Sequence, residues 1–113
     1  MSKNLASVIF ERAVQLWTPD RRCYGKEKMN RLLNGTIVFP SKFCAVGVLK
    51  QARKDVGISG RLYSINKLAK MLGYVDADHL MRENDGGRYY QKNQQSKIYE
   101  AMKKAAKGEL FSC

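Results

Sequence analysis

Cys44 is the residue whose type and position are best suited to covalent chemistry. The sequence predicts a helix capped by Ser41, with Cys44 in its first turn beside Lys42. A helix N-terminus and a nearby cation both favour the reactive thiolate. His79 would then serve as the base, oriented by a residue at 84–85. Because an apolar run surrounds Cys44 and cysteines in such runs are usually inert, a thiol-dependent enzyme is our third hypothesis.

The cysteines and the histidine do not indicate metal chemistry. The three cysteines, Cys23, Cys44 and Cys113, and the single histidine lack the paired spacing of zinc ligands. We therefore expect no metal and no cofactor. An odd number of cysteines without a C-x-x-C pair, and no apolar leader, are typical of a reduced, cytoplasmic protein. No apolar stretch reaches the roughly 18 residues that cross a bilayer, so we expect no membrane partner.

The distribution of charge is the most informative feature of the chain. The formal net charge is +11, and residues 21–70 contain twelve Lys and Arg residues but two acids, a net charge of +10. Residues 71–88, in contrast, carry a net charge of −2. A field of one sign favours a polyanionic partner, such as nucleic acid or an acidic protein surface.

Tyrosines alternate with cations at 22–26, 61–63 and 88–92. In RNA or single-stranded DNA, such rings stack unpaired bases while the cations hold phosphates. The alternative is structural, because tyrosines at segment ends often seal the core while their hydroxyls stay in water. The candidate nucleic-acid-binding residues are Arg21, Arg22, Tyr24, Lys26, Lys28, Arg31, Lys50, Arg53, Lys54, Arg61, Arg88 and Tyr89.

The apolar spacing predicts a mainly α fold. We expect a single compact domain over residues 1–113, with four or five helices and at most a short β-hairpin. Capping residues, glycines and prolines set the expected ends of these elements. The expected helices run from about 5 to 17, 41 to 56, 64 to 72, 76 to 83 and 93 to 108, and the hairpin lies around 31–39. Residues 84–87 are expected to break the chain between the last two helices.

Residues 64–80 have the outline of a helix-turn-helix and are similar to that of AraC-type regulators. The second helix should enter the major groove, but residues 76–85 carry four acids against one arginine, which would repel phosphates. We therefore expect a helical corner that does not read DNA sequence. Val75 and Leu80 have the spacing of a hydrophobic staple that would fix the angle of this corner.

Three segments together resemble an uncharacterised family of small bacterial and bacteriophage proteins. They are the N-terminal helix that ends at Trp17, the run 43–49 (Phe-Cys-Ala-Val-Gly-Val-Leu), and 83–85 (Glu-Asn-Asp) followed by 87–88 (Gly-Arg). The family shows a Cys-Ala-x-Gly-Ala-Leu helix start and a Trp-Asn-Asp turn before a closing helix. The outline covers almost the whole chain.

The chain departs from that family at Val48, where the family has Ala, and at Glu83, where it has Trp. The resemblance implies a compact, mainly helical bacterial or phage protein, and assigns it no activity. It also implies that Cys44, Gly47 and 84–85 hold the fold or line a shared site. A structural role agrees with their chemistry, because Asn and Asp side chains readily hydrogen-bond nearby backbone groups.

Taken together, these features indicate a small, basic, non-enzymatic binding protein of phage type. Its expected partner is nucleic acid, with RNA or single-stranded DNA favoured, or a host machine that contains nucleic acid. The second hypothesis is a phage inhibitor or adaptor that docks on an acidic surface of a host protein. The salt dependence of binding separates the two, because contacts to phosphates release counterions.

Overall fold

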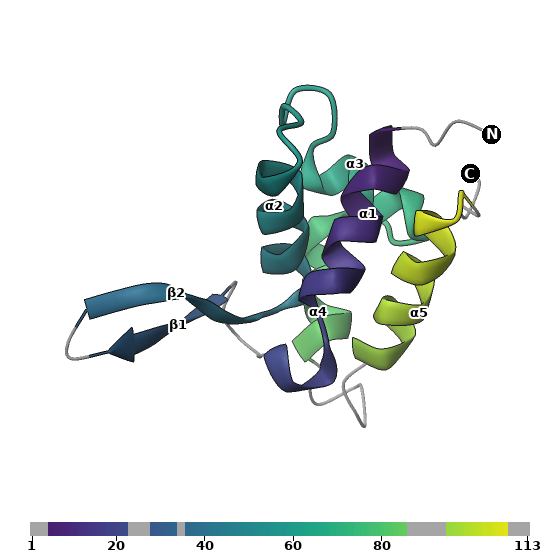
Figure 1. Ribbon diagram of the computed structural model, residues 1–113. Helices are drawn as coiled ribbons and strands as arrows, with labels where there is room; N and C mark the ends of the chain where they lie inside the picture. Colours follow the sequence, from purple (N-terminus) through teal and green to yellow (C-terminus); the bar gives the residue numbers. More distant parts are fainter. Residues whose placement is uncertain (1–4, 23–27, 34–35, 86–94, 109–113) are drawn as a thin grey trace.

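The computed structural model describes residues 5–22, 28–33, 36–85 and 95–108 of the chain (Figure 1). Its elements are α1 (Leu5–Leu16), the 3-10 turn η1 (Pro19–Arg21), β1 (Lys28–Leu33), β2 (Thr36–Phe43), α2 (Ala45–Asp55), α3 (Ile65–Met71), α4 (Ala77–Asp85) and α5 (Gln95–Ala106). The predicted fold class, a mainly α, single compact domain of four or five helices, is confirmed for these residues.

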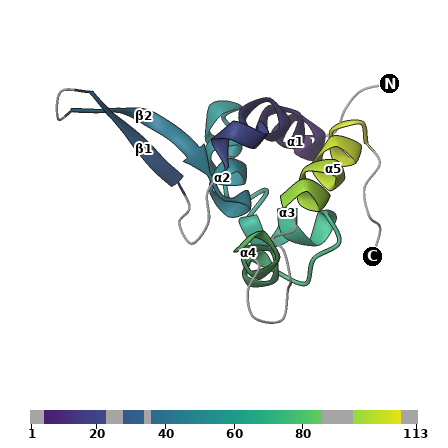
Figure 2. The same cartoon turned by 90° about the horizontal axis from the view of Figure 1, so that it is seen from below.

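The helices enclose one apolar core. In the bundle, α1 lies between α2 and α5, while α3 and α4 close the opposite side (Figures 1 and 2). Apolar residues three or four positions apart on α1 face this interior, and Ile9, Phe10 and Ala13 are fully buried. Fully buried large side chains also come from the other helices, namely Leu49, Leu68, Leu80 and Met102. Each buried side chain of this size stabilises the fold by about 1.5–3 kcal/mol.

The start of α2 differs from the prediction. Ser41 lies in β2, and the N-cap is Cys44, whose Sγ accepts a hydrogen bond from the N–H of Gly47 (3.4 Å). The helix starts later because the strand pairing extends to Phe43, and its backbone is therefore extended up to the cap. The end is as predicted, since Gly57 adopts a left-handed conformation (φ 72°) just after the last turn.

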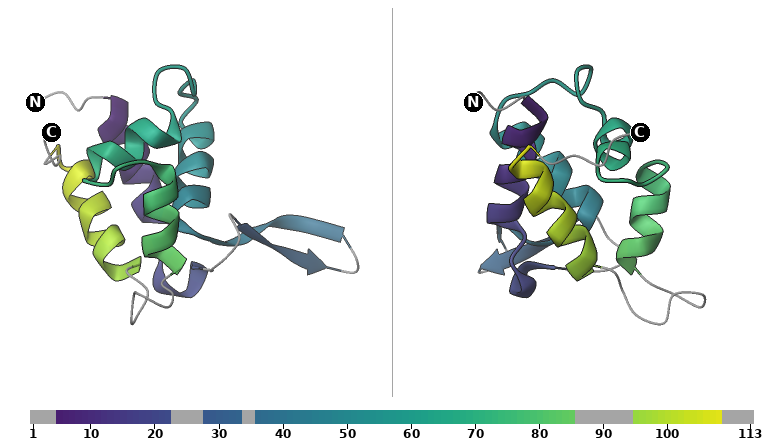
Figure 3. Two further views of the ribbon diagram at one scale, coloured as in Figure 1. Left: turned by 180° about the vertical axis from the view of Figure 1, so that it is seen from behind. Right: turned by 90° about the vertical axis from the view of Figure 1, so that its right-hand side faces the viewer.

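The hairpin is longer than the predicted 31–39. Strands β1 and β2 pair in antiparallel register from Lys28 opposite Phe43 to Leu33 opposite Thr36, with two irregularities in the ladder. The ribbon extends away from the helices, and only its base approaches them, near η1 and the start of α2 (Figures 1 and 3). The hairpin is therefore an arm on the helical bundle rather than a layer of its core.

α3 and α4 form the helical corner that the sequence predicts. Ser64 caps α3, because its Oγ accepts a hydrogen bond from the N–H of Lys67 (3.1 Å). Gly73 follows α3 with a left-handed conformation (φ 97°). Asp76 caps α4, because its Oδ1 accepts a hydrogen bond from the N–H of His79 (2.8 Å). These local signals set both ends of the turn.

The predicted hydrophobic staple is wrong. Leu80 is fully buried, but Val75 is 69% exposed and does not join it in the core. Hydrogen bonds fix the corner instead, because Asn66 Oδ1 accepts from the N–H of Ala77 (2.8 Å). In addition, the N–H of Val75 donates to Nδ1 of His79 (3.1 Å).

α4 also continues further than predicted, through Asn84 and Asp85, which the sequence placed in a break. Asn84 is fully buried, and its polar side chain takes part in the core. α5 begins at Gln95 and is followed by the left-handed Gly108 (φ 89°). The helix end near Gly108 is therefore as predicted.

Candidate nucleic-acid-binding surface and cleft

Three segments that the sequence singled out meet at the start of α2, which we call the α2 junction. The indole Nε1 of Trp17 donates to the carbonyl oxygen of Phe43 (2.8 Å). Oδ1 of Asn84 accepts from the N–H of Ala45 (2.9 Å) and from Nε2 of Gln95 (3.1 Å). All of these groups are buried, so the bonds hold α1, the hairpin base, α2, α4 and α5 together.

Cys44 lies inside the α2 junction and is fully buried. Its Sγ caps α2 and contacts Sδ of Met81 at 3.9 Å. His79, the proposed base, lines a surface cleft, and its Nδ1 accepts the backbone N–H of Val75. A thiol nucleophile must reach its substrate, so this geometry favours a structural role for Cys44.

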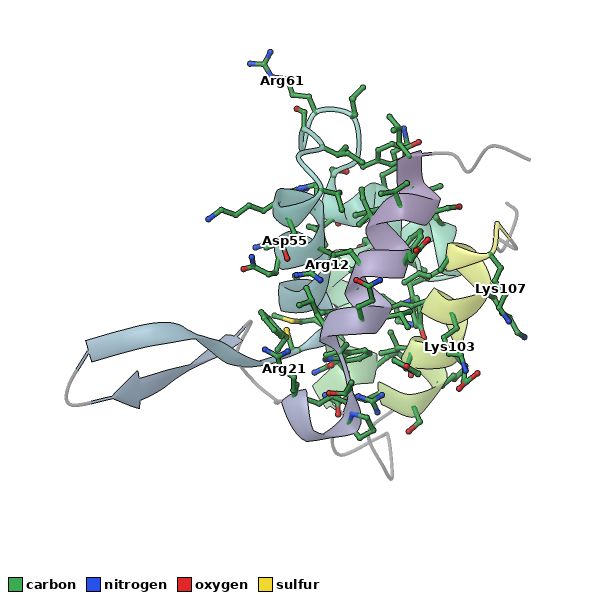
Figure 4. The ribbon with its side chains drawn as sticks, in the orientation of Figure 1. Arg12, Arg21, Asp55, Arg61, Lys103 and Lys107 are labelled. Carbon is green, nitrogen blue, oxygen red and sulfur yellow. The ribbon has the colours of Figure 1, made fainter. Side chains whose placement is uncertain are left out.

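Cations with exposed side chains occupy the outer side of α2 and the loop that follows. Lys50 and Lys54 are exposed on α2, and Arg61 is exposed at the far end of the loop 56–64 (Figure 4). On α3, the exposed Lys67 and Lys70 continue this surface. Both lysines belong to the basic stretch of the sequence, but the candidate residues chosen from the sequence did not include them.

Arg53 was predicted to contact nucleic acid, but it holds the loop 56–64 in place. Its Nη1 donates to the carbonyl oxygen of Tyr63 (2.9 Å). Its guanidinium lies 3.3 Å from the position that a Cβ would take at Gly60, so a larger residue there would displace it. Lys67 secures the same loop, because its Nζ donates to Leu62 O (3.2 Å) and lies 4.7 Å from the centre of the Tyr63 ring.

Asp55 is the one acid in residues 28–73. Its Oδ2 accepts from Nε of Arg12 on α1 (3.0 Å), and the two side chains lie side by side in Figure 4. Its Oδ1 accepts from Nε2 of Gln51 (2.7 Å). The ion pair with Arg12 compensates the negative charge of Asp55. As a result, the surrounding cations dominate the field that a partner meets there.

Arg22, another predicted contact residue, is fixed between two aromatic rings. Its guanidinium carbon lies 4.9 Å from the ring centres of Trp17 and of Tyr99, and both Nε and an Nη donate to Trp17 O at 3.4 Å. Cation–π contacts of this kind stabilise by about 0.5–2 kcal/mol. Arg22 therefore ties the end of α1 to α5, while Arg21 lies half-exposed in η1.

The remaining candidates can be placed only in part. The backbones of Lys28 and Arg31 lie in β1, on the projecting arm. Tyr24, Lys26, Arg88 and Tyr89 lie outside the described residues. The structure thus brings Lys50, Lys54 and Arg61 together on one side, whereas Arg22 and Arg53 serve the fold.

A cleft of about 560 Å³ lies on another side of the bundle, between α5 and the α3–α4 corner. It is lined by Leu72, Gly73, Tyr74, His79, Glu83, Lys97, Glu100, Ala101 and Lys104. Burial raises the pKa of Tyr74 to about 12, and the charge of Glu83 adds to this shift. The sequence did not predict this site, because its walls come from segments far apart in the chain.

Comparisons of the chain with protein-family models, with curated proteins and with solved structures found no match. None of the helices in the described residues is long and apolar enough to cross a membrane. The described residues also contain no group of three or more His, Cys, Asp or Glu side chains that could hold a metal ion.

Proposed function

We propose that this chain is a small, non-enzymatic protein, of the phage type that the resemblance implies, that binds RNA or single-stranded DNA. The binding surface, which we call the basic surface, comprises the hairpin, the outer side of α2, the loop 56–64 and α3. The observation that carries the proposal is its charge: residues 28–73 contain nine Lys and Arg residues and one acid, Asp55, which is paired with Arg12.

The acids limit the extent of this surface. Asp76 and the residues of α4 contribute four acids against one arginine. α4 packs against α2 and α3, and Asp78 lines a pocket together with Lys50. A strand bound on the basic surface would therefore follow the cations of α2 and of the loop 56–64 and stay clear of the acids at this edge.

The test measures fluorescence anisotropy of labelled RNA and single-stranded DNA oligonucleotides. Affinity should fall steeply between about 50 and 200 mM salt, because each phosphate contact releases counterions. The double variant Lys54→Glu/Arg61→Glu should bind more weakly and have a shallower salt slope, by about 1.4 for two lost contacts to a single strand. Both residues are exposed, so the fold should be retained.

The matched control is Lys103→Glu/Lys107→Glu, which makes the same change in net charge in the last turn of α5 and just beyond it, away from the loop that carries Arg61 (Figure 4). The control should lose far less affinity than the variant of the basic surface. Equal losses would mean that binding depends on net charge alone and would refute the assignment of the surface. Absence of binding to both polymers would refute the proposed function and leave an acidic protein surface as the partner to test.

A further inference from the structure

The cleft between α5 and the α3–α4 corner contains a carboxylate with spare capacity to accept hydrogen bonds. The side chain of Glu83 is 14% exposed, and its Oε1 lies 3.6 Å from Nε2 of His79. Its charge also helps to raise the pKa of Tyr74 on the same wall. A carboxylate offers about four acceptor positions, and a partly buried one gains most from donors that reach it without water.

His79 is held in one orientation beside this carboxylate. Because Nδ1 accepts the N–H of Val75 (3.1 Å), the proton of the neutral ring is on Nε2, on the side of Glu83. The imidazole meets the ring of Tyr74 edge-on, with ring centres 5.3 Å apart. One third of the His79 side chain remains exposed in the cleft. The wall therefore combines a fixed aromatic ring with an adjacent acceptor.

The opposite wall carries cations. Lys97 and Lys104 lie seven residues apart on α5 and both line the cleft, so their backbones are about 10.5 Å apart along the helix axis. Both side chains are exposed. Glu100 lies between them in the sequence, but it forms an ion pair with Lys103 (3.9 Å). The α5 wall is thus suited to an anionic group attached to a ligand that enters the cleft.

We propose that this cleft binds a guanine nucleotide. Glu83 accepts hydrogen bonds from the base N1–H and N2–H, the base packs against His79, and Lys97 or Lys104 holds the phosphate. Guanine fits because it is the only common base with two adjacent N–H donors on one edge, which match the two oxygens of a carboxylate. The volume is within the range of small-ligand sites. If the guanine belongs to a nucleic-acid strand, the proposal rests on the proposed function. If the ligand is a free nucleotide, the proposal does not depend on that function.

The test is a titration with GMP, AMP, CMP and UMP, followed by calorimetry and by NMR shifts of cleft residues. GMP should bind about tenfold more tightly than the other three, the discrimination typical of a bidentate contact to a base. Glu83→Gln should remove this preference, because a glutamine side chain has only one acceptor oxygen. Its NH2 group would face the second N–H of guanine, and two donors cannot form a hydrogen bond with each other. The matched control is Glu100→Gln on the α5 wall, which should keep the preference for GMP.

The phosphate contact is tested with guanosine. The parent should bind GMP about tenfold more tightly than guanosine, the usual scale for charge-assisted hydrogen bonds, and Lys97→Met/Lys104→Met should remove the difference. Both lysines are exposed and lie away from the core, so the variant should fold. It therefore tests the site even if Glu83→Gln fails to fold. Equal affinity for all four nucleotides, or no binding of any of them, would overturn the proposal.

Oligonucleotides distinguish the two sources of guanine. If Glu83→Gln weakens binding of a strand that contains guanine but not of one that lacks it, the ligand is a base within nucleic acid. If only GMP is affected, the ligand is a free nucleotide. If the cleft binds no nucleotide, the proposal for the basic surface still stands, because the variant Lys54→Glu/Arg61→Glu lies outside the cleft and tests that surface independently.

Discussion

Removal of the buried amide in Asn84→Ala should destabilise the protein strongly. The substitution removes the acceptor for two buried donors, the N–H of Ala45 (2.9 Å) and Nε2 of Gln95 (3.1 Å). Each buried group left without a partner costs about 1–3 kcal/mol, so the expected loss is about 2–6 kcal/mol. For a domain of this size, this corresponds to a fall in melting temperature of about 8–24 °C.

The chain contains a matched control, because Asn66 Oδ1 accepts the N–H of Ala77 (2.8 Å), the first residue of α4. The bond is of the same type, but Asn66 is exposed, and water can replace the amide in Asn66→Ala. The cost there should be about 1 kcal/mol, as for other exposed helix caps. Urea unfolding followed by circular dichroism measures the free energy of unfolding of both variants. Equal losses of stability would mean that the burial of Asn84 does not determine how much its side chain stabilises the fold.

Two further predictions concern buried groups. Because the folded pKa of Tyr74 is about 12 against an ordinary value of 10.0, deprotonation favours the unfolded chain, and the free energy of unfolding should fall as pH rises from about 10 to 12. Glu83→Gln should lower this pKa, as measured by phenolate absorbance with Tyr74→Phe as the reference; an unchanged titration would contradict the contribution of Glu83. Cys44, in a Cys23→Ser/Cys113→Ser background, should react with a thiol reagent only as fast as the protein unfolds, whereas rapid reaction of the native protein would place the thiol at the surface.

The ends of several elements could be predicted because their signals are local. Ser64 and Asp76 accept hydrogen bonds from the N–H three residues ahead, and Gly57 and Gly73 end helices in the left-handed conformation. The start of α2 could not be predicted this way. It depends on how far β2 pairs with β1, and this pairing makes Cys44 the cap.

For the site too, local features could be predicted from the sequence, whereas features that depend on residues distant in the chain could not. Uneven charge is visible in the sequence, but the roles of individual cations are set by distant neighbours. Arg22 is held by Trp17, just after α1, and by Tyr99 on α5, whereas Arg61 is exposed at the end of a loop. Asn84 looked like a turn residue because its hydrogen-bond partner, Ala45, is 39 positions away in the chain.

The α2 junction has a mechanical consequence for the arm. The hairpin joins the bundle at Phe43, where Trp17 holds its carbonyl oxygen and Arg22 forms an isolated bridge. The eight residues of β2 extend about 26 Å, so a tilt of about 10° at this pivot would move the tip by about 4–5 Å. That distance exceeds the rise of one nucleotide in a stacked strand, about 3.4 Å. If the arm contacts a strand as proposed, a small loosening of the buried junction would shift its far end by about one nucleotide, so the stiffness of the core would set the positional precision of the arm.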